Sequence, residues 1–160
     1  MSPTRIHHIR QQGYFELSDR QIRLLAWGNR TSFIMSTLVL AAGVGLSSIE
    51  ILALLLICNI LGFILPIHPF DWLYNKVLAK RWRRPALPNR SEQIKFAFML
   101  TSIWLLTTIY LFYSEFTLAG YIMGGTLTLN SLLLSAFDLS LSAGIYNYIF
   151  LRNQKPFHTK

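Results

Sequence analysis

The sequence predicts an all-α polytopic membrane protein, with four transmembrane helices arranged as two hairpins and with amphipathic helices at the membrane interface. Three observations support this fold class. Four long apolar stretches hold most of the hydrophobic residues, and charged residues make up only 14% of the 160-residue chain. Every basic residue also lies outside these stretches or at their margins. An ordinary soluble domain has about 25% charged residues, so this composition disfavours a soluble protein.

The four apolar stretches have roughly the length of a membrane span. They cover residues 31–49, 51–67, 96–113 and 116–151. The first three contain 19, 17 and 18 residues without a charge, and about 20 apolar residues in a helix cross a hydrocarbon core of about 30 Å. The alternative is four buried helices of a soluble protein. Such helices require a polar face, which the all-apolar residues 52–57 do not provide.

The fourth stretch is too long for one span. Its 36 residues would form a helix of about 54 Å, well beyond the thickness of the hydrocarbon core. We therefore expect a span over residues 116–137 and a second helical piece over residues 139–151. That piece would bend along the interface or protrude, and Asp138 would lie between the two.

The basic residues predict the topology. The two short turns between the paired spans contain one Glu each and no Lys or Arg, whereas all 15 basic residues lie in the N-terminal segment, the middle loop and its margin, and the tail. The positive-inside rule then places both termini in the cytoplasm. The predicted segments are a cytoplasmic N-terminal segment with an amphipathic helix (1–30), transmembrane hairpin 1 (31–67), a cytoplasmic basic loop with an interfacial helix (68–95), transmembrane hairpin 2 with a helical extension (96–151) and a cytoplasmic tail (152–160).

Two amphipathic helices are predicted on the cytoplasmic side. Ser18 and Gln21 have the spacing of a capping box, so a helix should begin there. The Gly28-Asn29 pair predicts a bend before the first span. The prolines at positions 66 and 69 should end the second span and start a new helix.

The new helix has an apolar face and a polar face at helical spacing. The apolar positions are Phe70, Leu73, Tyr74, Val77 and Leu78, and the residues expected to face away from them are Asp71, Asn75, Lys76 and Lys80. Trp72 and Trp82 are the expected anchors at the level of the lipid headgroups. The residues that could contact anionic lipid are Lys76, Lys80, Arg81, Arg83 and Arg84. The alternative is that these charges serve only to orient the protein.

The sequence contains few candidates for chemistry. It has no glycine-rich phosphate loop, no Cys-x-x-Cys pair and no paired-histidine helix motif, and we predict no catalytic residue, cofactor or metal site. The polar residues that could act together are Asp138, Asn59, Asn130 and His68. Asp138 has three interpretations: a position at the headgroups just past the fourth span, an interhelical hydrogen bond to Asn59, Asn130 or Thr107, or part of a proton or ion path.

A family resemblance follows from the layout of the chain. The second span leading into Pro66-Ile67-His68-Pro69-Phe70, the basic loop and the last two spans together resemble the bacterial membrane family called domain of unknown function 4395, over about residues 20 to 152. Members commonly carry a Cys-Leu-Gly-Cys motif late in the fourth apolar stretch. The matching place here is Ser140-Leu141-Ser142-Ala143, so both cysteines are replaced. The resemblance carries over no established activity.

These observations lead to a functional expectation. We expect a non-catalytic accessory, structural or assembly subunit, in the inner membrane of a bacterium, that packs against another membrane protein or against itself and contacts anionic lipid. The alternative is a membrane-embedded enzyme, transporter or redox partner that uses the polar residues around Asp138. The low charge content argues against nucleic-acid binding, despite the net charge of +8.

Overall fold

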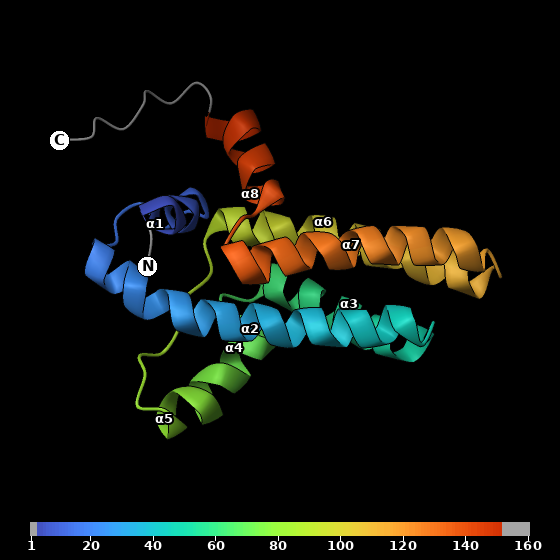
Figure 1. Ribbon diagram of the computed structural model, residues 1–160, viewed down its shortest axis with the longest axis horizontal. Helices are drawn as coiled ribbons and strands as arrows, with labels where there is room; N and C mark the ends of the chain where they lie inside the picture. Colours follow the sequence, from blue (N-terminus) through green and yellow to red (C-terminus); the bar gives the residue numbers. More distant parts are fainter. Residues whose placement is uncertain (1–2, 152–160) are drawn as a thin grey trace.

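The computed structural model describes residues 3–151, and this part of the chain is built from helices (Figure 1). The helices are α1 (Pro3–Gln11), α2 (Asp19–Gly45), α3 (Ile49–Ile64), α4 (Pro69–Leu73), α5 (Ala79–Arg81), α6 (Glu92–Tyr113), α7 (Thr117–Phe137) and α8 (Leu141–Tyr146). Two short π-helical segments are η1 (Tyr74–Leu78) and η2 (Asn147–Leu151). The predicted all-α class is therefore confirmed.

Four helices form an antiparallel bundle. α3 packs against α6, and α2 packs against α7. The two short turns, α2–α3 and α6–α7, lie together at one end (Figure 1). Residues with positive φ, Ser47 at 49° and Glu115 at 63°, close these turns. Leu40, Leu52, Leu55, Leu105 and Leu127 are among the buried residues that fill the bundle between them.

The number of membrane-compatible helices is smaller than the four predicted. Two helices, α6 and α7, are long and apolar enough to cross a membrane, and α3 becomes a third only when it is counted together with its bent continuation, residues 69–81. α3 stops at Ile64 because Pro66 and Pro69 follow it. α2 is 27 residues long, but its first part is polar. Four spans are therefore not confirmed.

The outer surfaces of the bundle helices are apolar. In the most apolar 18-residue segment of α6, only 22% is buried inside the structure, and in that of α7 only 17%. Side chains such as Ile103, Leu106, Leu118 and Ile122 are each more than half exposed. A soluble protein rarely exposes a continuous apolar surface of this kind, whereas a helix facing lipid does so as a rule.

Each hairpin continues into a helical segment that leaves the bundle. The first arm, residues 69–81, comprises α4, η1 and α5 and turns 86° from α3. The second arm, residues 141–151, comprises α8 and η2 and leaves the bundle in another direction (Figure 1). α7 ends at Phe137, as predicted, and the chain turns at Asp138, which has a positive φ of 57°.

An asparagine clamps each arm. The side chain of Asn75 accepts from the Leu87 N–H at 2.7 Å and donates to the Leu87 carbonyl at 3.1 Å. Asn147 donates to the carbonyl of Gln11 at 2.9 Å and accepts from Gln93 at 3.4 Å. The two arms also share a change from α-helical to π-helical geometry. It begins at Tyr74, next to Asn75, in the first arm, and at Asn147, next to Tyr146, in the second arm.

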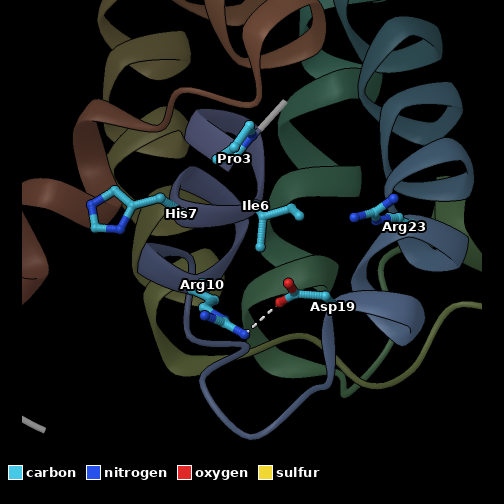
Figure 2. Close-up of a pocket in the computed structure, with 6 residues that line it drawn as sticks. All are labelled: Pro3, Ile6, His7, Arg10, Asp19 and Arg23. Carbon is cyan, nitrogen blue, oxygen red and sulfur yellow. Dashed lines mark hydrogen bonds and ion pairs between the residues drawn. The ribbon is translucent and has the colours of Figure 1, made fainter. Parts of the chain in front are cut away.

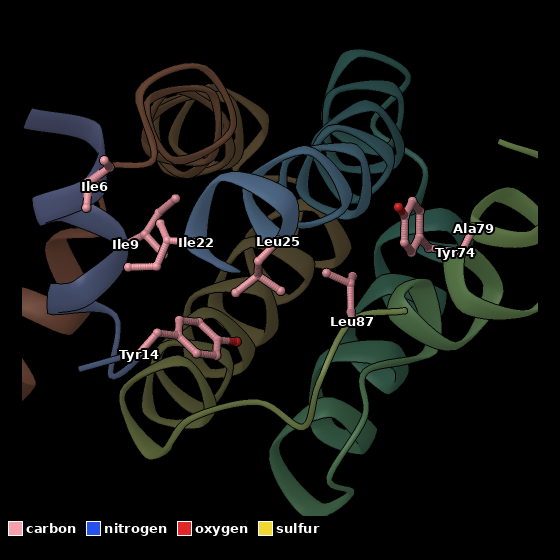
Figure 3. Packing of buried hydrophobic residues seen from close by; sticks show 8 residues of the cluster. All are labelled: Ile6, Ile9, Tyr14, Ile22, Leu25, Tyr74, Ala79 and Leu87. Carbon is pink, nitrogen blue, oxygen red and sulfur yellow. The ribbon is translucent and has the colours of Figure 1, made fainter. Parts of the chain in front are cut away.

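The end of the bundle opposite the two turns carries the basic residues, and we call it the basic end. It comprises α1, the start of α2, the first arm, the connector 82–91 and the start of α6, and every Lys and Arg among residues 3–151 lies on these elements. A buried cluster joins α1, α2, the first arm and the connector (Figure 3). Its members are Ile6, Ile9, Tyr14, Ile22, Leu25, Tyr74, Ala79 and Leu87.

One local prediction at the basic end was wrong and one is confirmed. α2 continues through Gly28 and Asn29 as one helix, and both residues are buried. Asp71 does not face away from the apolar side of the first arm but is fully buried. The capping box between Ser18 and Gln21 forms as predicted.

Candidate functional site

A buried ion pair joins Asp71 in α4 to Arg90 in the connector. Arg90 donates from Nε to Asp71 Oδ2 and from Nη2 to Asp71 Oδ1, both at 2.5 Å. The two side chains are 0% and 1% exposed. Such a two-pronged contact is the strongest geometry for an arginine and a carboxylate.

Helix α2 supplies two further partners of this pair. Ser32 donates to Asp71 Oδ1 at 2.5 Å, and Arg90 Nη1 donates to Asn29 Oδ1. We call these four residues, Asp71, Arg90, Asn29 and Ser32, the Asp71 network. Burial alone would lower the pKa of the Arg90 guanidinium, but Asp71 and then Tyr14 outweigh it, so the pKa is raised. The Asp71 network joins α2, the first arm and the connector, and the buried side-chain atoms of Asp71 and Arg90 all have hydrogen-bond partners.

His68 lies beside this network, at the start of the first arm. Its Nδ1 accepts from the Phe70 N–H at 3.2 Å, so His68 is the N-cap of α4. The imidazole stacks on Phe98 at a centroid distance of 4.4 Å and is 2% exposed. Its Nε2 is buried without a hydrogen-bond partner. His68 is therefore a packed residue inside the fold.

Asp138 lies at the end of α7, where α1 and α2 meet it. Its Oδ2 accepts from Arg5 Nε at 3.0 Å and from Arg30 Nη2 at 3.4 Å. Gln12 donates to its carbonyl oxygen at 2.7 Å. Burial raises the pKa of the Asp138 carboxyl, although Arg5 and His8 act in the opposite direction. Asp138 forms no described hydrogen bond with Asn59, Asn130 or Thr107, so the interhelical interpretation is wrong.

This geometry makes Asp138 an anchor for α1. Basic side chains of α1 and α2 also reach the carbonyls at the end of α7. Arg5 Nη2 and Arg30 Nη2 donate to the Ala136 carbonyl at 2.5 and 3.3 Å, and His8 Nδ1 lies 3.2 Å from the Phe137 carbonyl. Positive charge is favourable at this end of a helix. One atom of the carboxylate and one of the Arg30 guanidinium have no partner: Asp138 Oδ1 and Arg30 Nε are buried without hydrogen bonds.

Replacing Asp138 should therefore loosen α1 and leave the bundle intact. We expect Asp138→Asn to lower the protection of the α1 amides against hydrogen exchange about tenfold, which corresponds to about 1.4 kcal/mol. Asp19→Asn is the matched control, because it removes an exposed ion pair of α2 with Arg10 that should contribute well under 1 kcal/mol. Equal loss of protection in both variants would contradict the anchoring role.

A second charged feature is a pocket of about 240 Å³ between α1 and the start of α2 (Figure 2). It is lined by Pro3, Ile6, His7, Arg10, Asp19 and Arg23. Arg10 donates to Asp19 at 2.6 Å, and both side chains are more than 40% exposed. Since Asp19 balances Arg10, this pocket is a weakly charged surface hollow.

The four polar residues grouped from the sequence do not meet in one site. Asn59 is buried in α3, donates to the Leu55 carbonyl at 2.9 Å and lines a small cavity of about 50 Å³ with Ser36, Thr101 and Ser131. Asn130 instead lines a groove between α6 and α7. His68 lies at the start of the first arm and Asp138 at the end of α7.

The predicted lipid-contact residues are exposed on the first arm and the connector. They are Lys76, Lys80, Arg81, Arg83 and Arg84. Lys76 Nζ lies 4.6 Å from the centroid of the Trp72 ring, and Trp72 is 55% exposed. Trp82, 45% exposed, packs edge-on against Trp27 at 4.7 Å. The two predicted anchors are therefore both accessible from outside the protein.

Sequence reasoning missed Arg90, Arg5 and Gln12. Arg90 looked like one more basic residue of the loop, yet it is the best-buried cation of the described chain. One signal could have indicated it: Asp71 is an acid in an otherwise apolar and basic region, and a buried acid needs a cation. The described residues contain no group of three or more His, Cys, Asp or Glu side chains that could hold a metal ion. Cys58 is a half-buried free thiol.

The length, composition and apolar surfaces of these helices define the class of protein. It is an all-α protein in which two helices, or three with the bent pair, are compatible with crossing a membrane. The chain belongs to the family described as Domain of unknown function (DUF4395), which matches residues 19–150. Helix α1 thus lies outside the matched region. No curated protein and no solved structure is significantly similar to the chain.

Proposed function

We propose that the protein is a non-catalytic accessory or assembly subunit that packs against a transmembrane helix of another membrane protein. In this proposal the basic end faces the cytoplasm of a bacterium, the bundle lies in the inner membrane and the two arms lie along the interface. The positive-inside rule supports the orientation. The 86° turn after α3 supports an arm that runs in the membrane plane.

The observation that carries the proposal is a groove between α6 and α7 that is lined by Asn130, whose amide oxygen has no hydrogen-bond partner. The groove has a volume of about 310 Å³, and its lining residues are Leu100, Thr101, Ile103, Trp104, Thr107, Met123, Leu127 and Asn130. Asn130 lines the groove, and its Oδ1 is buried without a hydrogen-bond partner. Trp104 and Thr107 already donate to backbone carbonyls, of Met123 and Ile103 respectively.

An unpaired acceptor inside a bilayer favours one kind of neighbour. Asn130 lies seven residues before the end of α7, about 10 Å along the helix axis, so in a spanning α7 its amide lies within the hydrocarbon region. Lipid chains offer no donor, and an unsatisfied polar group there is costly. A helix with a Ser, Thr, Asn or Gln donor would satisfy it, and such bonds contribute about 0.6 kcal/mol on average in membrane proteins.

The alternative of an enzyme, transporter or redox partner centred on Asp138 has less support. Arg5 and Arg30 both donate to Asp138 Oδ2, and the contact with Arg5 connects α1 to the end of α7. If Asp138→Asn abolished the protein's cellular function while its fold and assembly were retained, this alternative would be favoured over the accessory role.

Site-specific crosslinking tests the accessory role. A photoreactive side chain at Ile103, 58% exposed and beside the groove, should form an adduct with another polypeptide in cells. The same group at Ile60, exposed on α3, should form mainly lipid adducts. Asn130→Ala should reduce the Ile103 adduct severalfold, whereas Leu129→Ala, on the exposed side of α7, should not. A partner-free monomer with only lipid adducts at Ile103 would overturn the proposal.

A further inference from the structure

An apolar pocket lies at the elbow, residues 65–68, where α3 ends and the first arm begins. It has a volume of about 350 Å³ and is lined by Leu65, Pro66, Ile67, Pro69 and Trp72. The pocket exists because the prolines stop α3 and turn the chain by 86°. The turn leaves a wedge between the end of an apolar helix and the first turn of the arm.

Basic side chains flank this pocket on the arm. Lys76 Nζ lies 4.6 Å from the ring centroid of Trp72, which itself lines the pocket. Lys80 follows four residues later and is exposed, so it continues the same side of the arm. The nearest acid along the arm, Asp71, is fully buried and paired with Arg90. The positive charge beside the pocket is therefore not balanced by the arm's own carboxylate.

We propose that the elbow binds one anionic phospholipid. Its acyl chain and glycerol region would occupy the pocket between Ile67 and Trp72, and its phosphate and anionic headgroup would contact Lys76 and Lys80. The combination argues for a lipid, since an apolar seat joined to exposed cations matches a molecule that is apolar at one end and anionic at the other. This binding does not depend on a partner subunit, so it stands or falls separately from the accessory role.

The test is quenching of Trp72 fluorescence by phospholipids with brominated chains. The full chain is reconstituted in phosphatidylcholine, and brominated phosphatidylglycerol or brominated phosphatidylcholine is added. The Trp72 contribution is the difference between the wild-type protein and Trp72→Phe. We expect Trp72 to be quenched by phosphatidylglycerol at a severalfold lower mole fraction than by phosphatidylcholine.

Variants separate the headgroup contact from the chain seat. Lys76→Gln should weaken the preference for phosphatidylglycerol about fivefold, the effect of about 1 kcal/mol per basic residue. Lys95→Gln is the matched control, because it removes one charge from the same end but from a residue paired with Glu92 at 2.9 Å. Ile67→Phe, which fills the pocket, should reduce quenching by both lipids.

Three outcomes would overturn the proposal. Equal quenching by the two lipids would mean ordinary boundary lipid without a headgroup site. Equal loss of preference in Lys76→Gln and Lys95→Gln would mean a diffuse surface charge. Absence of quenching of Trp72 in a protein whose circular dichroism is unchanged would mean that no lipid chain enters the elbow.

Discussion

Asp71→Asn is expected to lower the free energy of unfolding by about 3–5 kcal/mol. The variant keeps the shape of the side chain but leaves the guanidinium of Arg90 buried without a counter-charge. Arg90 is 1% exposed and stacks over Phe33 at 4.9 Å, so water cannot replace the carboxylate. Because the pair joins α2, the first arm and the connector, its loss should loosen the basic end as a unit.

Denaturation of the purified protein in mild-detergent micelles would measure this effect. Arg90→Gln should lower the stability to a similar extent, and the double variant should lose less than the sum of the two single variants. Glu92→Gln is the control, since it breaks an exposed pair with Lys95 and should cost less than 1 kcal/mol. A loss of under 1 kcal/mol in Asp71→Asn would show that the pair is not the main junction of the basic end.

The Asp71 network shows where sequence reasoning stopped. The spacing of Phe70, Leu73 and Tyr74 predicts a helix, which the arm forms, but it assigns Asp71 to the outer face by polarity alone. In the structure Asp71 and Tyr74 share the buried side, because a cation from the connector lies there. No periodicity within the arm can reveal a partner that lies 19 residues away in an extended segment.

Local signals predicted the helix ends much better. The Ser18 capping box, the proline stop after α3 and the end of α7 at Phe137 all depend on residues within one or two turns. Helix α1 was not predicted, because its sequence is polar and an isolated nine-residue helix is marginal in water. It is held by tertiary contacts, through the buried side chains of Ile6 and Ile9 and the pair between Arg5 and Asp138.

The residues of the candidate site also differ in how well the sequence predicts their position. Exposed features, namely the basic residues of the first arm and the tryptophans at positions 72 and 82, follow from composition and spacing. Buried ones do not, because Asn59 lies in α3, Asn130 in the middle of α7, His68 at the start of the first arm and Asp138 at the end of α7. The sequence analysis grouped these four residues because they are polar and lie in or next to apolar stretches. In the structure, the packing of α3, α6 and α7 keeps them apart.

Gly62→Ala is expected to destabilise the protein by about 1–3 kcal/mol, the usual cost of overpacking. A Cβ at this position of α3 would clash with Cδ2 of His68 and would lie 3.1 Å from Cδ2 of Phe98. The imidazole cannot move aside easily, because it lies between Phe70 and Phe98 and caps α4 through its Nδ1. The added methyl group should therefore push the first arm away from α3.

Thermal unfolding in detergent, with two further variants, would test this mechanism. Gly125→Ala is the matched control in α7, where an added Cβ meets no atom within 4 Å. It should be neutral or stabilising by up to about 1 kcal/mol, since alanine favours a helix more than glycine does. In the Gly62→Ala background, His68→Ala should recover part of the lost stability. If it instead added its full cost, the clash with His68 would not be the cause, and the close approach of the arm to α3 would depend on another contact.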